Sequence, residues 1–150
     1  MSKPEPLLLI IDARFYEDIA DELVAGAIAV IESAGARYQH ISVPGVLEIP
    51  AALSMAMLGG EQDEVEYDGF VVLGCVIRGE TSHYDIVANE SARAVMDLAV
   101  DGCLAIGNGI LTVENREQAE KRAWRDQGDK GGVAAKAALA MMAVRDRLGV

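Results

Sequence analysis

The feature that most constrains the fold is a regular alternation between short strand-like segments and segments with helical spacing. The clearest strand-like segment is Phe70 to Val76, which is apolar at nearly every position and is predicted to be a strand buried on both faces. Three further strands are predicted at Leu7 to Ile11, Tyr38 to Val43 and Cys103 to Ile106. Strands that alternate with helices pair in parallel through right-handed crossovers, so we expect a parallel sheet.

The segments between and after these strands favour helices. In the first of them, Ile19, Leu23, Ala27 and Ile31 recur every fourth residue, as on one face of a helix, and Gly35 suits the C-terminal cap. The predicted helices run from Glu17 to Gly35, Pro50 to Gly59-Gly60, Tyr84 to Val100, Glu114 to Arg125 and Val133 to Leu148, with a charged surface connection from Glu61 to Glu66.

The resulting βαβαβαβαα order predicts an α/β fold, a three-layer α/β/α sandwich of the flavodoxin-like type with a four-stranded parallel sheet. A chain of 150 residues suits one domain, so we expect residues 1–150 to form a single domain. Ligands of such sheets bind beyond the carboxyl ends of the strands. The segments predicted to lie there are Ala13 to Tyr16, Pro44 to Ile49, Ile77 to His83 and Gly107 to Glu114.

Charge and composition argue against several classes of protein. A net charge of −11 disfavours binding to nucleic acid or to an anionic membrane surface, and no segment approaches the length of a membrane span. Cys75 and Cys103 lie in apolar runs without metal-binding spacing, so we expect buried free thiols and no metal site. The start of the chain has no cleavage motif and too short an apolar core for a signal peptide, which predicts a cytoplasmic protein.

The segment VIRGETSHYD, residues 76–85, holds most of the side chains capable of chemistry. Thr81 and Ser82 can cap the helix that follows, and the free N–H groups at its N-terminus can bind an anion. His83 lies in the first turn, where a histidine side chain can act as a general acid and base. The alternative is a histidine that only caps the helix. The other histidine, His40, lies within a strand and is expected to be structural.

Four more residues are candidates for a ligand site, and each has a simpler structural alternative. Arg122 can bind phosphate with two N–H groups, or pair with neighbouring carboxylates. Lys130 can approach a ligand through the surrounding glycines, or remain solvated. Phe15 can stack on a planar heterocycle, or close the edge of the core. Glu48 can accept hydrogen bonds from polyol hydroxyls, or stabilise a helix N-terminus.

Four segments, taken in their order and spacing, carry a resemblance that covers nearly the whole chain. They are ARFYEDI, VPGVLEIPAAL, LGCVIRGETSHYDIVANES and NGILTVENREQAEKRA, at residues 13–19, 43–53, 73–91 and 108–123. With them the chain resembles the lumazine synthase family. The resemblance implies condensation of 5-amino-6-(ribitylamino)uracil with 3,4-dihydroxy-2-butanone 4-phosphate to 6,7-dimethyl-8-ribityllumazine, the penultimate step of riboflavin biosynthesis. It also implies no metal or redox cofactor.

The resemblance further implies a role for each candidate residue. Phe15 would stack on the pyrimidine, Glu48 would hold the ribityl chain and His83 would transfer protons. The backbone that lines the same substrate is implied at Val46, Leu47, Val76 and Ile77. The phosphate is implied to contact Glu80, Thr81 and Arg122. Lys130 would reach the pyrimidine side.

Family members assemble as pentamers, and some build decamers or sixty-subunit shells, with the pocket between neighbouring subunits. The resemblance therefore implies a homopentamer in which Asn108, Arg122 and Lys130 reach the site of the next subunit. Neither Pro4 nor Pro6 has a backbone N–H to donate to a strand ladder, so a tail strand added to a neighbour is disfavoured. A larger assembly than the pentamer stays open.

Two residues depart from the family's pattern. Asn108 stands where well-known members carry a phenylalanine, and Asp126 stands where a basic residue is often found. Both favour one alternative, a catalytically weak paralogue that binds a lumazine or a flavin as an oligomeric scaffold. A flavodoxin-like electron carrier is disfavoured because DARFYED is not a Ser/Thr/Gly-rich phosphate loop. A receiver domain is disfavoured because Cys75 and Val76 stand where its aspartate is needed.

Overall fold

Strands and helices alternate along the chain, as the patterning predicts. The structure is a computed structural model and describes residues 4–62 and 65–150. The elements in these residues are β1 (Leu7–Ala13), α1 (Glu17–Ser33), β2 (Arg37–Val43), the 3-10 turn η1 (Val46–Glu48), α2 (Ile49–Gln62), β3 (Gly69–Ile77), α3 (His83–Gly102), β4 (Ile106–Val113), α4 (Arg116–Ala123) and α5 (Lys130–Leu148).

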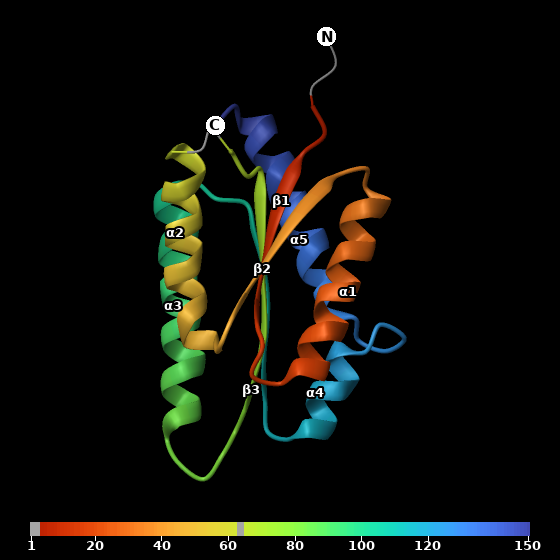
Figure 1. Cartoon of the computed structure of the whole chain (residues 1–150), viewed down its shortest axis with the longest axis vertical. Helices are drawn as coiled ribbons and strands as arrows, with labels where there is room; N and C mark the ends of the chain where they lie inside the picture. Colours follow the sequence, from red (N-terminus) through yellow and green to blue (C-terminus); the bar gives the residue numbers. More distant parts are fainter. Residues whose placement is uncertain (1–3, 63–64) are drawn as a thin grey trace.

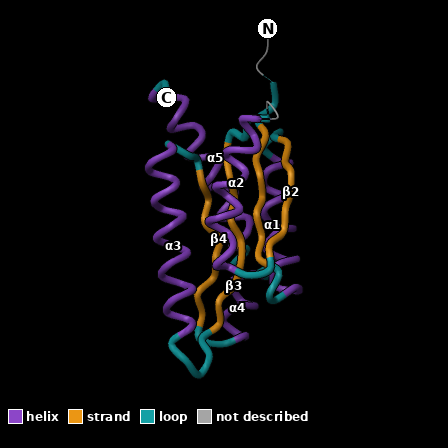
Figure 2. The backbone as a smooth tube through the Cα atoms, turned by 60° about the vertical axis from the view of Figure 1, so that its left-hand side comes forward, coloured by secondary structure: helices purple, strands orange, loops and turns teal. Residues whose placement is uncertain are grey.

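The strands form one four-stranded sheet in the order β2-β1-β3-β4, and all neighbouring pairs are parallel. In the register of the sheet, Leu8 of β1 lies opposite Tyr38 of β2 and Gly69 of β3, and Phe70 of β3 lies opposite Ile106 of β4. Figure 2 shows the strands side by side. The predicted four-stranded parallel sheet is confirmed.

Helices cover both faces of this sheet. Figure 1 shows α2 and α3 on one side and α1, α4 and α5 on the other, which confirms the three-layer sandwich. Side chains of β1 alternate between the layers: Leu8 and Ile10 pack toward α1 and α5, whereas Leu9 and Ile11 pack toward α2. Both faces of the central strands β1 and β3 are buried, so these two strands are almost entirely apolar. The packing on both faces holds their carboxyl ends at one edge of the sheet.

The fourth strand differs from its predicted position. The strand expected at Cys103 to Ile106 is found at Ile106–Val113, so most of the predicted loop from Gly107 to Glu114 is strand. The glycines in this strand misled the prediction. A Cβ atom on Gly107 would lie 1.7 Å from the carbonyl oxygen of Ala134, so glycine is needed here for the close approach of α5 rather than for a turn.

Two boundaries on the other face also differ. Cys103 ends α3 in the left-handed conformation, with φ 51°, and is exposed, so the prediction of a buried thiol is confirmed for Cys75 and wrong for Cys103. Helix α2 continues past Gly59-Gly60 to Gln62, because a helix tolerates glycine at a cost of about 1 kcal/mol. Of the predicted connection from Glu61 to Glu66, residues 63–64 lie outside the described residues. No helix in the described part of the chain is long and apolar enough to cross a membrane.

Candidate active site

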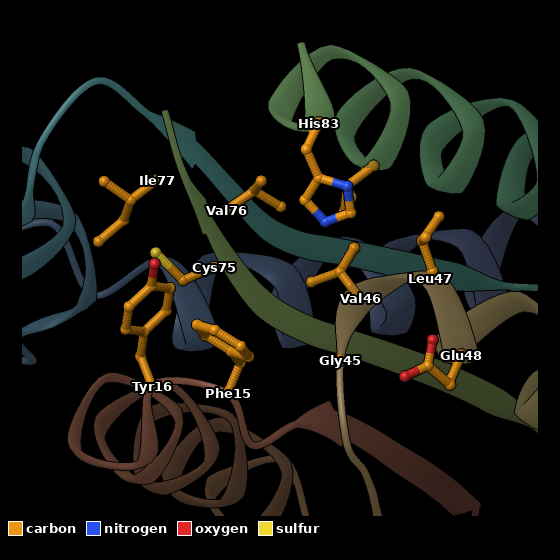
Figure 3. Close-up of a pocket in the computed structure, with 11 residues that line it drawn as sticks. Phe15, Tyr16, Gly45, Val46, Leu47, Glu48, Cys75, Val76, Ile77 and His83 are labelled. Atoms are coloured by element: carbon orange, nitrogen blue, oxygen red, sulfur yellow. The ribbon is translucent and has the colours of Figure 1, made fainter. Parts of the chain in front are cut away.

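A pocket of about 370 Å³ lies at the carboxyl edge of the sheet, where ligands of parallel α/β folds bind. Its walls come from the β1–α1 loop, the segment between β2 and α2, the end of β3 and the first turns of α3 (Figure 3). The lining residues are Phe15, Tyr16, Gly45, Val46, Leu47, Glu48, Cys75, Val76, Ile77, His83 and Val87. The lining is mainly apolar, with one carboxylate and one imidazole, as expected of a site for a small polar molecule that carries a flat ring.

One wall of the pocket is aromatic. Phe15 lies in the loop after β1 and is 73% exposed. Its ring contacts the ring of Tyr16 edge-to-face, with 4.9 Å between the centroids and 75° between the planes. The face of the Phe15 ring is therefore available for stacking on a planar ligand. Cys75 lies behind the two rings (Figure 3), and burial raises the pKa of its thiol to about 11. Cys75 is therefore a neutral, apolar part of the wall at neutral pH.

A second wall is made by the short 3-10 turn η1. Val46 is buried against the core, which anchors the turn, whereas Leu47 and Glu48 are exposed to the pocket side. Glu48 lies at the far end of the pocket from Phe15 in Figure 3. A carboxylate accepts several hydrogen bonds, so this end of the pocket suits a chain of hydroxyl groups.

The third wall carries the imidazole. His83 is the first residue of α3, and its ring points from the helix toward Val46 and Leu47 (Figure 3). Its backbone N–H donates to Oγ1 of Thr81 at 3.3 Å, whereas the side chain of Ser82 makes no capping hydrogen bond. The predicted position of His83 in the first turn of a helix is confirmed. An exposed imidazole that faces a pocket is free to exchange protons with a bound molecule.

Seven of the twelve predicted site residues line this pocket. They are Phe15, Val46, Leu47, Glu48, Val76, Ile77 and His83. The other five do not: Glu80 and Thr81 are exposed in the loop before α3, and Arg122 and Lys130 are exposed on α4 and α5. Asn108 lies within β4, where its Oδ1 accepts from the backbone N–H of Ile110 at 2.9 Å.

Four lining residues were not singled out from the sequence, although a signal for each was present. Tyr16 adjoins Phe15, Cys75 precedes the predicted pair Val76 and Ile77 on one strand, and Val87 lies one helical turn after His83. Gly45 lies within the segment from Pro44 to Ile49, which was predicted to lie at the ligand end of the sheet. Elsewhere, His40 has the structural role expected of it, because its Nε2 lies 2.6 Å from the buried carboxylate of Asp12. In residues 4–62 and 65–150, no three His, Cys, Asp or Glu side chains are grouped closely enough to hold a metal ion.

These features define an α/β protein with a small-molecule pocket at the carboxyl edge of its sheet. Comparison with known proteins gives the family. The profile of the 6,7-dimethyl-8-ribityllumazine synthase family matches residues 6–146. The chain is 61% identical over 150 residues to 6,7-dimethyl-8-ribityllumazine synthase 1 of Rhizobium meliloti (strain 1021), covering 99% of this chain and 98% of the relative.

A second relative, 6,7-dimethyl-8-ribityllumazine synthase of Agrobacterium fabrum, is 62% identical over 149 residues and 99% of both chains. A third, the protein of the same name from Bartonella tribocorum, is 57% identical over 147 residues, 98% of this chain and 95% of its own. The chain therefore belongs to the 6,7-dimethyl-8-ribityllumazine synthase family of enzymes.

Proposed function

We propose that this chain condenses 5-amino-6-(ribitylamino)uracil with 3,4-dihydroxy-2-butanone 4-phosphate to give 6,7-dimethyl-8-ribityllumazine, phosphate and two molecules of water. The observation that carries the proposal is one pocket bounded by an open aromatic face, a carboxylate and an imidazole, in a chain that belongs to this family. The relatives named above carry the name of this synthase. No cofactor enters the proposal.

The pocket suits the pyrimidine substrate in two ways. The open face of Phe15 is available for stacking on the flat ring, and Glu48, at the other end, is available to the hydroxyls of the ribityl chain. The rest of the lining that we assign to this substrate is apolar and comes from Val46, Leu47, Val76 and Ile77. A substrate held at both ends presents its amine in one orientation, so much of the rate would come from proximity.

His83 is the residue that we propose for proton transfer. The amine attacks the ketone, water leaves to form an imine, phosphate is eliminated and the ring closes with loss of a second water, and each of these steps moves a proton. An imidazole titrates near neutral pH and can both take up and return a proton during one turnover. The exposed ring of His83, aimed into the pocket, is placed for that task.

We propose that the phosphate is bound by the loop containing Glu80 and Thr81 together with Arg122. Arg122 is exposed, and within residues 4–62 and 65–150 its recognised donor contact is from Nη1 to the carbonyl oxygen of Gln118 at 3.0 Å, so other N–H groups of the guanidinium can bind an anion. Asn108, Arg122 and Lys130 do not line the pocket of their own chain. We therefore propose that they complete the pocket of a neighbouring subunit in a homopentamer.

Exposed apolar side chains on the α2 and α3 layer support an assembly. Four of them are 60–69% exposed: Met55, Leu58, Met96 and Val100. Large apolar side chains that are exposed favour burial against another surface, and we propose a second copy of the chain as that surface. Sedimentation of the purified protein as one species near the 15.9 kDa mass of the monomer would contradict the pentamer.

The catalytic proposal is tested by lumazine formation, followed by fluorescence, in the parent and in His83→Ala and Arg122→Ala variants. The parent should exceed the slow uncatalysed reaction of the two substrates. Removal of a general acid–base group lowers kcat by about 10²–10⁴-fold, and loss of the arginine should mainly raise the KM for the phosphate substrate. Arg37→Ala, at the amino end of β2 and so at the opposite edge of the sheet from the pocket, should leave both constants unchanged.

A catalytically weak paralogue that binds a lumazine or a flavin is the second candidate, and Asn108 is the observation that favours it. The Asn108 side chain accepts a hydrogen bond from the backbone N–H of Ile110 and offers no apolar surface to a ring. If the parent binds the pyrimidine substrate or riboflavin but does not exceed the uncatalysed rate, the paralogue is supported, and Asn108→Phe is the substitution to make first.

A further inference from the structure

Two arginines flank the pocket without lining it. Arg14 immediately precedes Phe15, and Arg78 immediately follows Ile77. We propose that both are positioning residues with separate tasks: Arg14 fixes Phe15 for the heterocyclic substrate, and Arg78 fixes the loop of residues 79–82 for the phosphate-bearing substrate. This inference rests on the function proposed above and extends it to residues outside the pocket.

Arg14 ties the end of β1 to the start of α1. Its two terminal nitrogens donate to different carboxylates, Nη1 to Asp12 at 2.9 Å and Nη2 to Asp21 at 2.5 Å. Its backbone N–H donates to the carbonyl oxygen of Val43 at 2.9 Å, which extends the pairing with β2. These hydrogen bonds, above all the one to Asp12, raise the pKa of the guanidinium, so the clamp stays charged at every pH at which the enzyme is folded.

The carboxylate that anchors Arg14 is itself immobile. Asp12 is fully buried, and its second oxygen is 2.6 Å from both Nε2 of His40 and Oγ of Ser42, on the neighbouring strand. The Phe15 ring, in contrast, is largely exposed and touches one other ring. The direction in which Phe15 points is therefore set by its backbone, and that backbone is held by Arg14.

Arg78 makes the corresponding connection on the opposite side of the pocket. Nε donates to Glu114 at 2.8 Å, just beyond β4, and Nη1 lies 3.5 Å from Asp85 in the first turn of α3. The guanidinium also lies over the ring of Tyr84, 4.2 Å from its centroid. The backbone N–H donates to Val113. Arg78 thus joins the ends of β3 and β4 to the helix that begins with His83.

The partners of the two arginines do not overlap. Asp12 and Asp21 hold the first, and Glu114, Asp85 and Tyr84 hold the second. Contacts without shared partners act almost independently, so each arginine can be removed without disturbing the other. The pairs of Arg78 are exposed and add little to stability, whereas loss of Arg14 removes a donor from the buried carboxylate of Asp12, so the unfolding midpoint of each variant is measured beside its KM values.

The test compares the KM values for the two substrates in two variants, each of which should raise only one of the two values. Arg14→Gln should raise the KM for the pyrimidine about tenfold and leave the KM for the butanone phosphate within about twofold, because a misplaced contact weakens only the ligand that it serves. Arg78→Gln should do the reverse. Arg37→Gln is the control, because the Arg37 guanidinium also joins two segments, by a hydrogen bond to the carbonyl oxygen of Glu5, but at the amino end of β2 and so away from the pocket.

Two milder substitutions distinguish a local change in the pocket from a loss of folding. Asp21→Asn and Glu114→Gln each remove one exposed anchor, and each should shift the same KM as its arginine by about threefold at an unchanged midpoint of thermal unfolding. Equal increases in both KM values, or no change in either, would overturn the proposal. So would a loss of activity that follows the unfolding midpoint alone.

The parent separates a failure of this proposal from a failure of the proposed function. If the parent does not exceed the uncatalysed rate, the synthase activity fails, and the same contrast is then measured by calorimetric titration with the pyrimidine substrate and with inorganic phosphate. A selective loss of pyrimidine affinity in Arg14→Gln, and of phosphate affinity in Arg78→Gln, would still support the two clamps. A parent that binds neither probe would refute both proposals.

Discussion

The two helical layers of this sandwich are packed in different ways. On the α1, α4 and α5 side, helices approach the sheet and one another so closely that a Cβ atom on Gly131 would lie 1.9 Å from the carbonyl oxygen of Leu23. On the α2 and α3 side, no such approach surrounds Gly59, where an added Cβ would meet nothing within 4 Å. That layer also carries the exposed apolar residues Met55, Leu58, Met96 and Val100.

The two layers therefore differ in how closely their backbones approach. Backbone-to-backbone packing through glycine leaves no room for rearrangement, so the first layer fixes the sheet and the ends of its strands. Apolar side chains are exposed on both layers, since α5 exposes Val133, Met141, Val144 and Leu148. The pocket draws on both layers, because Phe15 and Tyr16 lead into α1 whereas Glu48 and His83 lead into α2 and α3.

The largest effect is expected at the closest approach in the tight layer. Gly107→Ala places a methyl group 1.7 Å from the carbonyl oxygen of Ala134, and only a shift of α5 can relieve that contact. We expect a loss of about 3 kcal/mol or more in the free energy of unfolding, measured by urea denaturation. A variant as stable as the parent would show that the two layers do not differ in this way, since alanine is otherwise no worse than glycine in a strand.

The two thiols offer a second contrast, of intermediate size. Burial raises the pKa of Cys75 from 9.0 to about 11, so between these values the unfolded chain loses a proton that the folded chain keeps. Stability from this group is therefore complete below pH 9 and is lost as pH rises toward 11, by up to about 2 kcal/mol. Denaturation at pH 8 and at pH 10.5, with Cys75→Ala beside the parent, measures this loss.

Thiol labelling at pH 8 provides the control. The exposed Cys103 should react with a thiol reagent quickly, and Cys75 only on unfolding. Equal labelling rates at the two positions would contradict the buried environment of Cys75.

The smallest effect is expected in the open layer and has the opposite sign to that of Gly107→Ala. Gly59 lies inside α2 with free space around its Cα, so Gly59→Ala should stabilise the protein by about 0.5–1 kcal/mol through better helix propensity. The midpoint of thermal unfolding should rise accordingly. A destabilised variant would contradict the free space beside Gly59.

The elements with the strongest local signals were predictable from the sequence. The run from Phe70 to Val76 and the stripe that begins at Ile19 depend on periodicity within a few residues, and both were found as predicted. The pocket residues were accessible for a related reason: a parallel sheet brings the ends of its strands to one edge, so Phe15, Glu48 and His83 had to lie near one another.

Other features depended on contacts between segments far apart in the chain. Residues 107 and 109 looked like loop glycines, but they are strand residues that face α5, and no local pattern could show that this helix packs against them. Cys103 resembled a strand residue because its neighbours are apolar, yet it ends α3 and is exposed. Likewise, neither arginine that flanks the pocket stood out, because their partners are fixed by the meeting of strand and helix ends.

The sequence by itself therefore determined the order and type of most elements, the parallel sheet, the edge at which a ligand binds and the family. These properties follow from periodicity and chain topology, which a linear pattern contains. The tertiary structure alone decided where β4 begins, which of the two thiols is buried and how Arg14 and Arg78 are held. These depend on distances between remote segments, and such distances are set only when the layers pack.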